Sequence, residues 1–266
     1  MATIAENLQT IQNIKQNIKT AIENKGVDMT NTPFSEYSTK IDEITTGGGS
    51  GKIDISATGI KLGYSTFTEI PDIIDFSNVT DMSGMFCGCE NITTIAPIDT
   101  SNVTNMEDMF KDCSKLQSIP QFDTAKVTDM SGMFYYCTSL QTIPQLNTSN
   151  VINIGNVFSD CTKLQSIPLL DFGNVKTTFY FFGWSNINTL TDLGGFKNLK
   201  TSINYCFLDR TPNLTTDSLM NVINNVYDLT ANGLSGQTLK FGQTNLDKLT
   251  AEQIAVATAK GWTLTA

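Results

Sequence analysis

Histidine is absent from this chain of 266 residues. Its absence excludes the Ser-His and Cys-His arrangements of nucleophilic catalysis and every metal site that needs an imidazole ligand. Charged residues are also scarce, at 16%, so neutral Asn, Gln, Ser and Thr must cover much of the surface. The net charge is -9. Because an acidic chain repels phosphate backbones, we expect no nucleic-acid partner.

Long apolar runs are missing as well. No segment approaches the roughly 20 apolar residues that span a bilayer, and the first residues lack the basic start and apolar run of a signal peptide. We therefore expect that the chain does not insert into a membrane. We also expect that it is synthesised in a cytoplasm, where the six cysteines stay reduced. The apolar share of 40% still suffices for a sizeable core.

What the sequence does contain is an internal repeat of 24 residues, kept over five units without an insertion. Its main columns are Phe86, Phe110, Phe134, Phe158 and Phe182; Cys89, Cys113, Cys137 and Cys161; Asp75, Asp99, Asp123, Asn147 and Asp171; and Val79, Val103, Val127, Val151 and Val175. A single short unit cannot bury its own apolar side, whereas stacked units bury a continuous one. The repeat therefore predicts a solenoid.

Each unit is expected to hold one short strand, near residues 116–119, which a proline ends. Neighbouring strands then pair into a parallel sheet at a spacing of about 4.8 Å. The aspartate of the polar turn at 99–102 can accept a hydrogen bond from the amide two residues on. The Met-Phe pair is expected on a helical or 3₁₀ turn at the opposite side.

The cysteine and aspartate columns could belong to metal sites or disulfides. Zinc sites, however, use cysteines two to four residues apart, and calcium-binding repeats supply several oxygens per turn. One cysteine per unit between apolar neighbours fits a small buried hydrophobic residue instead. We expect no metal, no cofactor and no catalytic residues, so the chain is not expected to be an enzyme.

Two polar columns follow the predicted strands and are the candidate ligand-binding residues. They are Gln117, Gln141 and Gln165, and beside them Ser118, Thr142 and Ser166. A solvated face with cross-strand hydrogen bonds is the favoured interpretation, and a surface for glycan or protein ligands is the other. Trp184, in the aromatic cluster at 179–184, could stack on a sugar ring.

The N-terminal module, residues 1–46, is predicted to be helical. An apolar stripe with heptad-like spacing runs along residues 3–24 and comprises Ile4, Leu8, Ile11, Ile18 and Ile22. The stripe either packs on the second helix or the repeats, or it mediates self-association. In the second case isoleucine at both core positions favours three or four helices over two, and we expect a homo-oligomer with a trimer favoured.

Three further segments complete the predicted organisation. Residues 47–51 are a Gly/Ser linker, residues 52–210 hold the repeats, and residues 211–266 form a small α+β cap. The cap is expected to contain a helix at 216–227, a strand at 238–241, a helix opened by a capping box at 250–253, and a strand from Trp262. Its expected role is to cover the last sheet edge.

The pattern Cys-x-x-Leu-x-x-Ile-Pro with Asn-Val-Thr-x-Met-x-x-Met-Phe resembles the BspA-like leucine-rich repeats, in the short version of mycoplasma, gut-bacterial and bacteriophage surface proteins. The N-terminal segment resembles the helical leader of tailed-phage virion proteins. The resemblance implies an α+β solenoid with a parallel β-sheet, an N-terminal α-helical anchor and a small α+β C-terminal cap.

In function, the same resemblance implies a structural protein on the virion surface of a tailed phage, a head fibre or tail fibre. Its N-terminus would bind other virion proteins, and its repeats would attach to a host-surface glycan or protein. The alternative is a bacterial cell-surface adhesin of the BspA-like class.

Overall fold

The computed structural model describes residues 74–183, 186–200 and 208–266, together with residues 16, 19, 23, 53 and 54. Gln16, Lys19 and Glu23 are helical, in agreement with the helix expected at 3–24, and Lys19 Nζ lies 3.7 Å from Glu23 Oε1. The predicted linker and oligomerisation residues lie outside the described residues. The latter are Ile4, Leu8, Ile11, Ile18 and Ile22.

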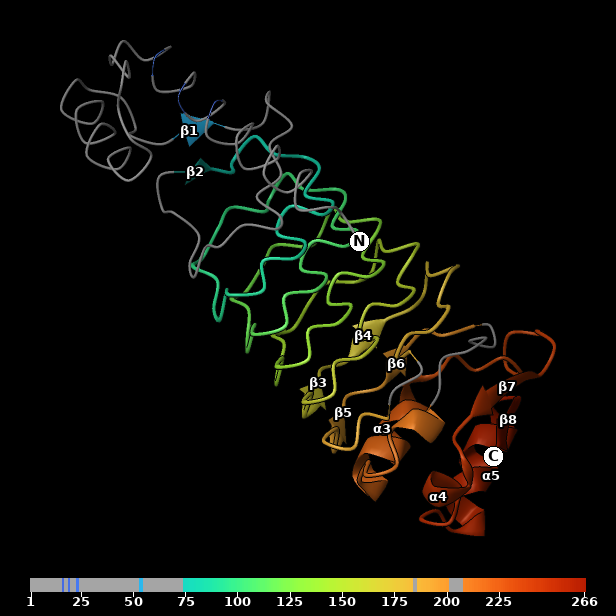
Figure 1. Ribbon diagram of the computed structural model, residues 1–266. Helices are drawn as coiled ribbons and strands as arrows, with labels where there is room; N and C mark the ends of the chain where they lie inside the picture. Colours follow the sequence, from blue (N-terminus) through green and yellow to red (C-terminus); the bar gives the residue numbers. More distant parts are fainter. Residues whose placement is uncertain are drawn as a thin grey trace.

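Residues 74–183 form a stack of 24-residue repeats, here called the repeat stack (Figure 1). The strands in the stack and next to it in the sequence are short and pair in parallel: β1 (Ile53–Asp54) with β2 (Ile74–Asp75), β3 (Ser166–Ile167) with β5 (Asp192–Leu193), and β4 (Leu170–Asp171) with β6 (Phe196–Lys197). The predicted parallel pairing is therefore confirmed.

The backbone pairing between repeats at 116–119 is narrower than the predicted strand. No strand is assigned there; a single backbone bond per repeat links the column, from the Gln117 amide to the Thr93 carbonyl at 3.0 Å and from the Gln141 amide to the Gln117 carbonyl at 3.0 Å. Thr142 and Ser166 form an isolated parallel bridge. Pro120, Pro144 and Pro168 follow two or three residues after these positions and lack the amide that a longer ladder needs, which limits its width.

The prediction of a helical or 3₁₀ turn at the Met-Phe pair is wrong. The segment at 82–88 forms turns in which alternate amides donate to the next repeat: Met82 to Asn105 O at 2.9 Å, Gly84 to Glu107 O at 2.7 Å, and Phe86 to Met109 O at 2.9 Å. The Met85 and Cys87 amides close turns three residues back within the same repeat, and the Ser83 amide donates to Asp81 Oδ1 at 2.8 Å. The backbone polar groups are thus shared between repeats rather than kept inside a helix.

Left-handed backbone conformations at two columns make this path possible. Residues at these columns have φ between 52° and 71°. They are Gly84, Asp108, Gly132, Asn156 and Tyr180 in the first column, and Gly88, Asp112, Tyr136 and Asp160 in the second. Most are glycine, aspartate or asparagine, the residue types that enter this region at least cost.

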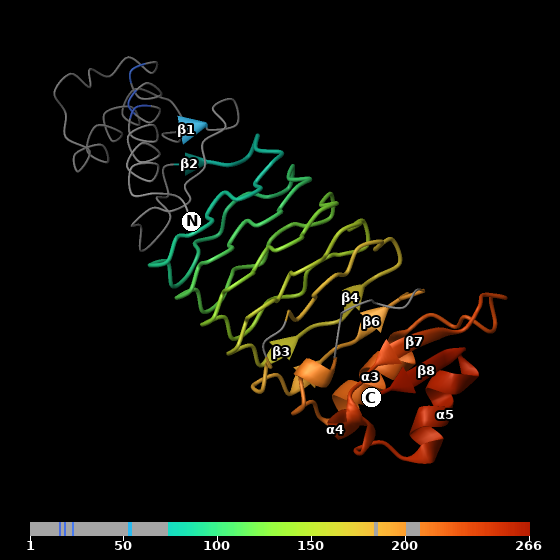
Figure 2. The ribbon, with the colours of Figure 1, turned by 45° about the vertical axis from the view of Figure 1, so that its right-hand side comes forward.

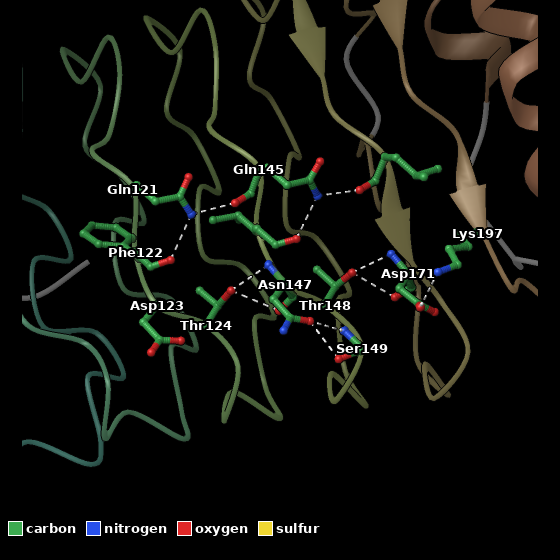
Figure 3. A pocket seen from close by; sticks show the side chains of 12 residues that line it. Gln121, Phe122, Asp123, Thr124, Gln145, Asn147, Thr148, Ser149, Asp171 and Lys197 are labelled. Carbon is green, nitrogen blue, oxygen red and sulfur yellow. Dashed lines mark hydrogen bonds and ion pairs between the residues drawn. The ribbon is translucent and has the colours of Figure 1, made fainter.

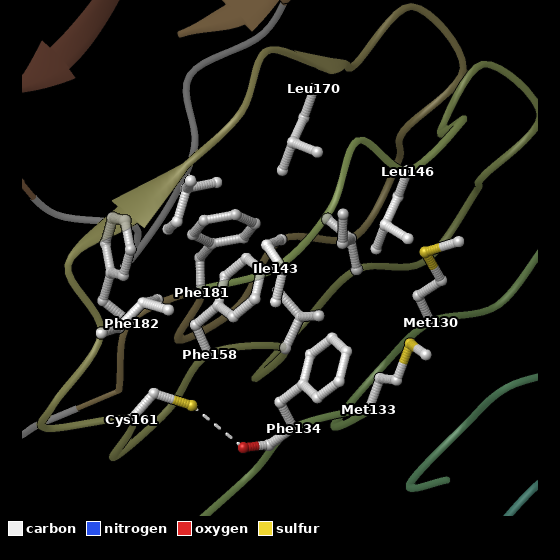
Figure 4. Packing of buried hydrophobic residues seen from close by; sticks show 14 of the residues in the cluster. Met130, Met133, Phe134, Ile143, Leu146, Phe158, Cys161, Leu170, Phe181 and Phe182 are labelled. Carbon is white, nitrogen blue, oxygen red and sulfur yellow. Dashed lines mark hydrogen bonds between the residues drawn. The ribbon is translucent and has the colours of Figure 1, made fainter. Parts of the chain in front are cut away.

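The core of the stack is the phenylalanine column. Phe110, Phe134 and Phe158 are fully buried, with ring centroids 5.9 and 5.8 Å apart and rings within 6° of parallel. The parallel stacking ends at Phe158. The ring of Phe181 contacts the ring of Phe158 edge-to-face, with the centroids 5.3 Å apart. Figure 4 shows the rings of Phe134, Phe158 and Phe181 with leucines and methionines packed around them. The inward position predicted for the column is confirmed.

The cysteine column is buried too, as predicted, and it has a further role. Each thiol donates to the carbonyl of a phenylalanine in the preceding repeat: Cys113 to Phe86 O at 3.1 Å, Cys137 to Phe110 O at 3.0 Å and Cys161 to Phe134 O at 3.1 Å. No disulfide joins the cysteines that the structure describes. Cys206 lies outside the described residues.

The C-terminal elements follow the predicted order, with additions (Figure 2). They are η2 (Leu208–Arg210), α3 (Thr216–Asn225), β7 (Gln237–Lys240), α4 (Gln243–Leu246), α5 (Ala251–Ala259) and β8 (Trp262–Thr265). β7 and β8 pair in parallel. The capping box at Thr250 and Gln253 is confirmed. The short helices η2 and α4 were not predicted.

Helix α3 packs against β5 and β6, at the end of the stack. The buried Ser218 hydroxyl donates to Thr191 O at 3.0 Å and accepts from the Leu193 amide at 3.0 Å. Asn221 Nδ2 donates to Leu193 O at 3.3 Å. Helix side chains therefore satisfy backbone groups of the last described repeat, as expected of a segment that covers a sheet edge.

Candidate functional site

An ordered column of turns builds one face of the repeat stack. The side-chain oxygen of the aspartate or asparagine accepts from the amide two residues on in all five repeats: Asp75, Asp99, Asp123, Asn147 and Asp171, at 2.8–3.1 Å. The turn role predicted for this column is confirmed. At Asp99, the hydrogen bonds from the Ser101 amide and hydroxyl lower the pKa of the carboxyl group.

A buried threonine, Thr100, Thr124 or Thr148, follows three of these turn residues and joins the turn to the next repeat. The Thr124 hydroxyl donates to Asn147 O at 3.0 Å and accepts from the Asn147 amide at 2.8 Å. Thr148 does the same with Asp171, at 2.9 and 2.7 Å. One threonine hydroxyl thus satisfies both the amide and the carbonyl of the turn residue in the next repeat, and the turns are held in register.

Two glutamines lie above the turns and form a ladder of their own (Figure 3). Gln121 Nε2 donates to Phe122 O at 3.1 Å and to Gln145 O at 2.7 Å. Gln145 Nε2 donates to Leu146 O at 3.0 Å and to Leu169 O at 2.7 Å. Both hydrogens of each amide are used, so the orientation of each side chain is fixed.

The turns, the threonines and the glutamines together border a shallow groove of about 560 Å³, here called the polar groove. Its side chains are mainly neutral and polar, with Asp123, Asp171 and Lys197 as its charged residues. Lys197 Nζ lies 3.9 Å from Asp171 Oδ2, and Asn198 Nδ2 donates to both oxygens of Asp171 at 3.1 and 3.0 Å. The Asp171 carboxylate is therefore already partnered.

The predicted ligand-binding residues lie next to the polar groove but do not line it. Gln117, Gln141, Gln165 and Thr142 are exposed, whereas Ser118 and Ser166 are half-buried. Trp184 lies outside the described residues. In the aromatic cluster, Phe181 and Phe182 are buried and Phe179 is exposed.

Gln121 and Gln145 were missed because only two repeats carry glutamine at that column; the equivalent positions hold Pro97 and Leu169. The available signal was their position, two residues before the turn residues Asp123 and Asn147. The predicted polar columns at 117–118, 141–142 and 165–166 recur in more repeats and therefore give the stronger signal in the sequence.

Two structural tests apply to the part of the chain that the structure describes. No group of three or more His, Cys, Asp or Glu residues there could hold a metal ion. None of the helices described is both long and apolar enough to cross a membrane.

Two comparisons find proteins to which this chain is similar, and the family match lies in its repeats. A family model described as "Mycoplasma protein of unknown function, DUF285" matches residues 62–183, less than half of the chain. A leucine-rich repeat protein from Bacteroides ovatus ATCC 8483 is similar at 18% identity and a TM-score of 0.37, over 66% of this chain and 51% of that one. The chain thus spans about half the length of that protein. No curated protein matches.

Proposed function

We propose that the protein is a non-enzymatic structural component of a tailed-phage virion, a fibre or decoration protein of the head or tail. Residues 1–46 anchor it to other virion proteins and assemble it as a homo-oligomer. The repeats form a solenoid that projects from the particle and attaches to a glycan or protein of the host surface. The resemblance of the N-terminal segment to phage leaders supports the location.

The observation that carries the binding role is the regular polar face of the repeat stack. Its backbone groups and turns are bonded between repeats, so the exposed side chains are held on a rigid frame. A rigid frame lowers the entropy that a ligand must overcome when it binds. Repeat stacks use such extended faces for recognition.

Immunogold electron microscopy tests the proposed location. Antibodies against residues 74–266 are applied to phage particles and to cell envelopes from a culture that carries the gene. We expect gold on intact particles. Label confined to the envelope would favour the alternative, a bacterial surface adhesin, and label on neither would overturn both functions.

A cell-binding assay tests attachment separately. The fluorescently labelled full chain is mixed with bacterial cells before and after mild periodate treatment, which oxidises vicinal diols of glycans, and before and after protease treatment. We expect binding that one of the two treatments removes. Binding to no strain that the phage infects would contradict the attachment role.

A further inference from the structure

We propose that the polar groove is a binding site for a neutral saccharide chain. The inference rests on the proposed attachment function and makes it specific, because it names the ligand class and places the site beside, not on, the columns at 117–118, 141–142 and 165–166. It is carried by the hydrogen-bonding state of the groove's side chains, taken one by one below.

The first observation is a pair of fixed acceptors. Because both Nε2 hydrogens of Gln121 and of Gln145 are bonded to carbonyls, neither amide can turn to present a donor. Figure 3 shows both Oε1 atoms on the same side, pointing away from the ladder. A ligand above them must therefore supply hydrogen-bond donors.

The second observation is a fixed donor in the same groove. Asn147 Oδ1 accepts from the amide and the hydroxyl of Ser149, at 3.1 and 2.7 Å. Its orientation is set by these bonds, and its Nδ2 donates no hydrogen bond within the described residues. Asn147 is exposed, so a ligand can reach this donor. The groove thus offers acceptors and a donor at set positions.

The third observation is the charge of the groove. Asp171 is partnered by Lys197 and Asn198, which leaves the exposed Asp123 with one oxygen beyond its turn bond. A phosphate or carboxylate ligand would meet this carboxylate and two fixed carbonyl oxygens, with Lys197 alone to attract it. Anionic ligands are therefore disfavoured, and one excess negative charge is weak attraction for a cationic chain.

A chain of neutral sugars fits these conditions, because each hydroxyl both donates and accepts one hydrogen bond. The two acceptors lie one repeat apart, at a spacing of about 4.8 Å for paired strands, close to the length of one hexose unit in an extended chain. Phe122 is buried and offers no ring for stacking. The site thus depends on hydrogen bonds, and we expect weak binding by each copy that oligomerisation strengthens.

The test uses the full chain and defined probes. Short neutral oligosaccharides of glucose, galactose, mannose, rhamnose and N-acetylglucosamine are immobilised and screened, and the best is measured by calorimetry; an oligoarginine peptide is the competing class. For Gln145→Ala we expect a loss of about fivefold in saccharide affinity, the factor given by one ordinary hydrogen bond. Gln165→Ala, an exposed glutamine outside the groove, should leave the affinity unchanged.

Asn147→Asp separates a binding effect from a folding effect. Aspartate occupies the same column at Asp99, Asp123 and Asp171, so the turn survives. The substitution removes the donor and adds a negative charge. We expect weaker saccharide binding with an unchanged melting curve.

Three outcomes would overturn the inference. If Gln141→Ala or Gln165→Ala abolishes saccharide binding and Gln145→Ala does not, the ligand lies on the neighbouring columns, and the attachment function survives without the groove. If only oligoarginine binds, and Asn147→Asp strengthens it, the groove recognises cations. If none of the probes binds although the protein binds cells, the site is elsewhere.

Discussion

At the scale of single residues, the phenylalanines of the middle repeats have similar surroundings, so one of these repeats can be tested for the others. Phe134 lies between two parallel rings and is fully buried, while Gln141 of the same repeat is exposed. We expect Phe134→Ala to reduce the free energy of unfolding by about 3–5 kcal/mol and Gln141→Ala by no more than about 0.5 kcal/mol. Urea melts of the two variants measure this, and equal losses would contradict the assigned orientation of the repeat.

The buried cysteines give a prediction about alkaline pH. Desolvation raises the pKa of the Cys113, Cys137 and Cys161 thiols above their ordinary value of 9.0. The unfolded chain therefore loses these protons first as the pH rises, so the free energy of unfolding should fall above pH 9. Denaturant melts at increasing pH should show this fall in the free energy of unfolding. The fall should be smaller in Cys137→Ala, because that variant has one buried thiol fewer.

A thiol reagent provides the control for that prediction. At neutral pH the thiols of Cys113, Cys137 and Cys161 should react slowly in the native protein and fast once it is denatured, whereas the half-buried Cys87 reacts sooner than these three. Fast native labelling of Cys113 or Cys137 would mean that these thiols are not enclosed.

The bridging threonines give a prediction about hydrogen bonds. Thr124→Val keeps the shape of the side chain but leaves the amide and the carbonyl of Asn147 without this partner. We expect a loss of about 1–3 kcal/mol in unfolding free energy. Thr128→Val is the matched control, because Thr128 also donates to a neighbouring repeat, at 3.1 Å, but is exposed. Similar losses in both variants would show that burial is not what makes the bridge important.

At the scale of elements, the sequence predicts what depends on apolar spacing and capping. The inward columns, the helix at Thr216–Asn225 and the capping box at Thr250 all follow from local patterns and are confirmed. The path of residues 82–88 was not predicted, because bonds between repeats replace the local ones that define a helix. Its signal was present in the aspartates, asparagines and glycines of the two left-handed columns, such as Asp108 and Asp112.

Helix α3 gives the prediction at this scale. Its Ser218 hydroxyl is the buried link that both donates to and accepts from the backbone around β5. We expect Ser218→Ala to lower the unfolding free energy by about 1–3 kcal/mol, and to increase hydrogen exchange at the Leu193 amide. Ser235→Ala, an exposed serine, is the control. Unchanged exchange at Leu193 would argue that α3 does not protect this end of the stack.

At the scale of the whole molecule, the N-terminal stripe gives a prediction that the described residues do not test. If residues 1–46 hold copies together, the full chain is an oligomer, and a trimer is favoured. Light scattering of the full chain measures the mass. We expect Ile11→Lys with Ile18→Lys to yield the monomer and Asn13→Lys, off the stripe, to leave the oligomer intact. A monomeric unsubstituted chain would refute the prediction.

The polar groove could not be derived from the sequence, because it depends on contacts between repeats. A groove is a property of several repeats at once, and the fixed orientation of Gln145 comes from the carbonyl of Leu169, one repeat away. The sequence shows that a polar side chain is exposed. Whether it presents a donor or an acceptor depends on contacts across 24 residues.

The amides of residues 82, 84, 86 and 88 all donate in one direction, to the following repeat, and the equivalent amides of the next two repeats do the same. In this segment each unit therefore donates to the following repeat and accepts from the preceding one, whereas at Gln117 and Gln141 the amide donates to the preceding repeat. A gene duplication that copies one complete unit adds a repeat whose donors and acceptors fit both neighbours, whereas a partial copy places them out of register. The length of the array can thus change in steps of one unit during evolution while its width and its surface pattern stay constant.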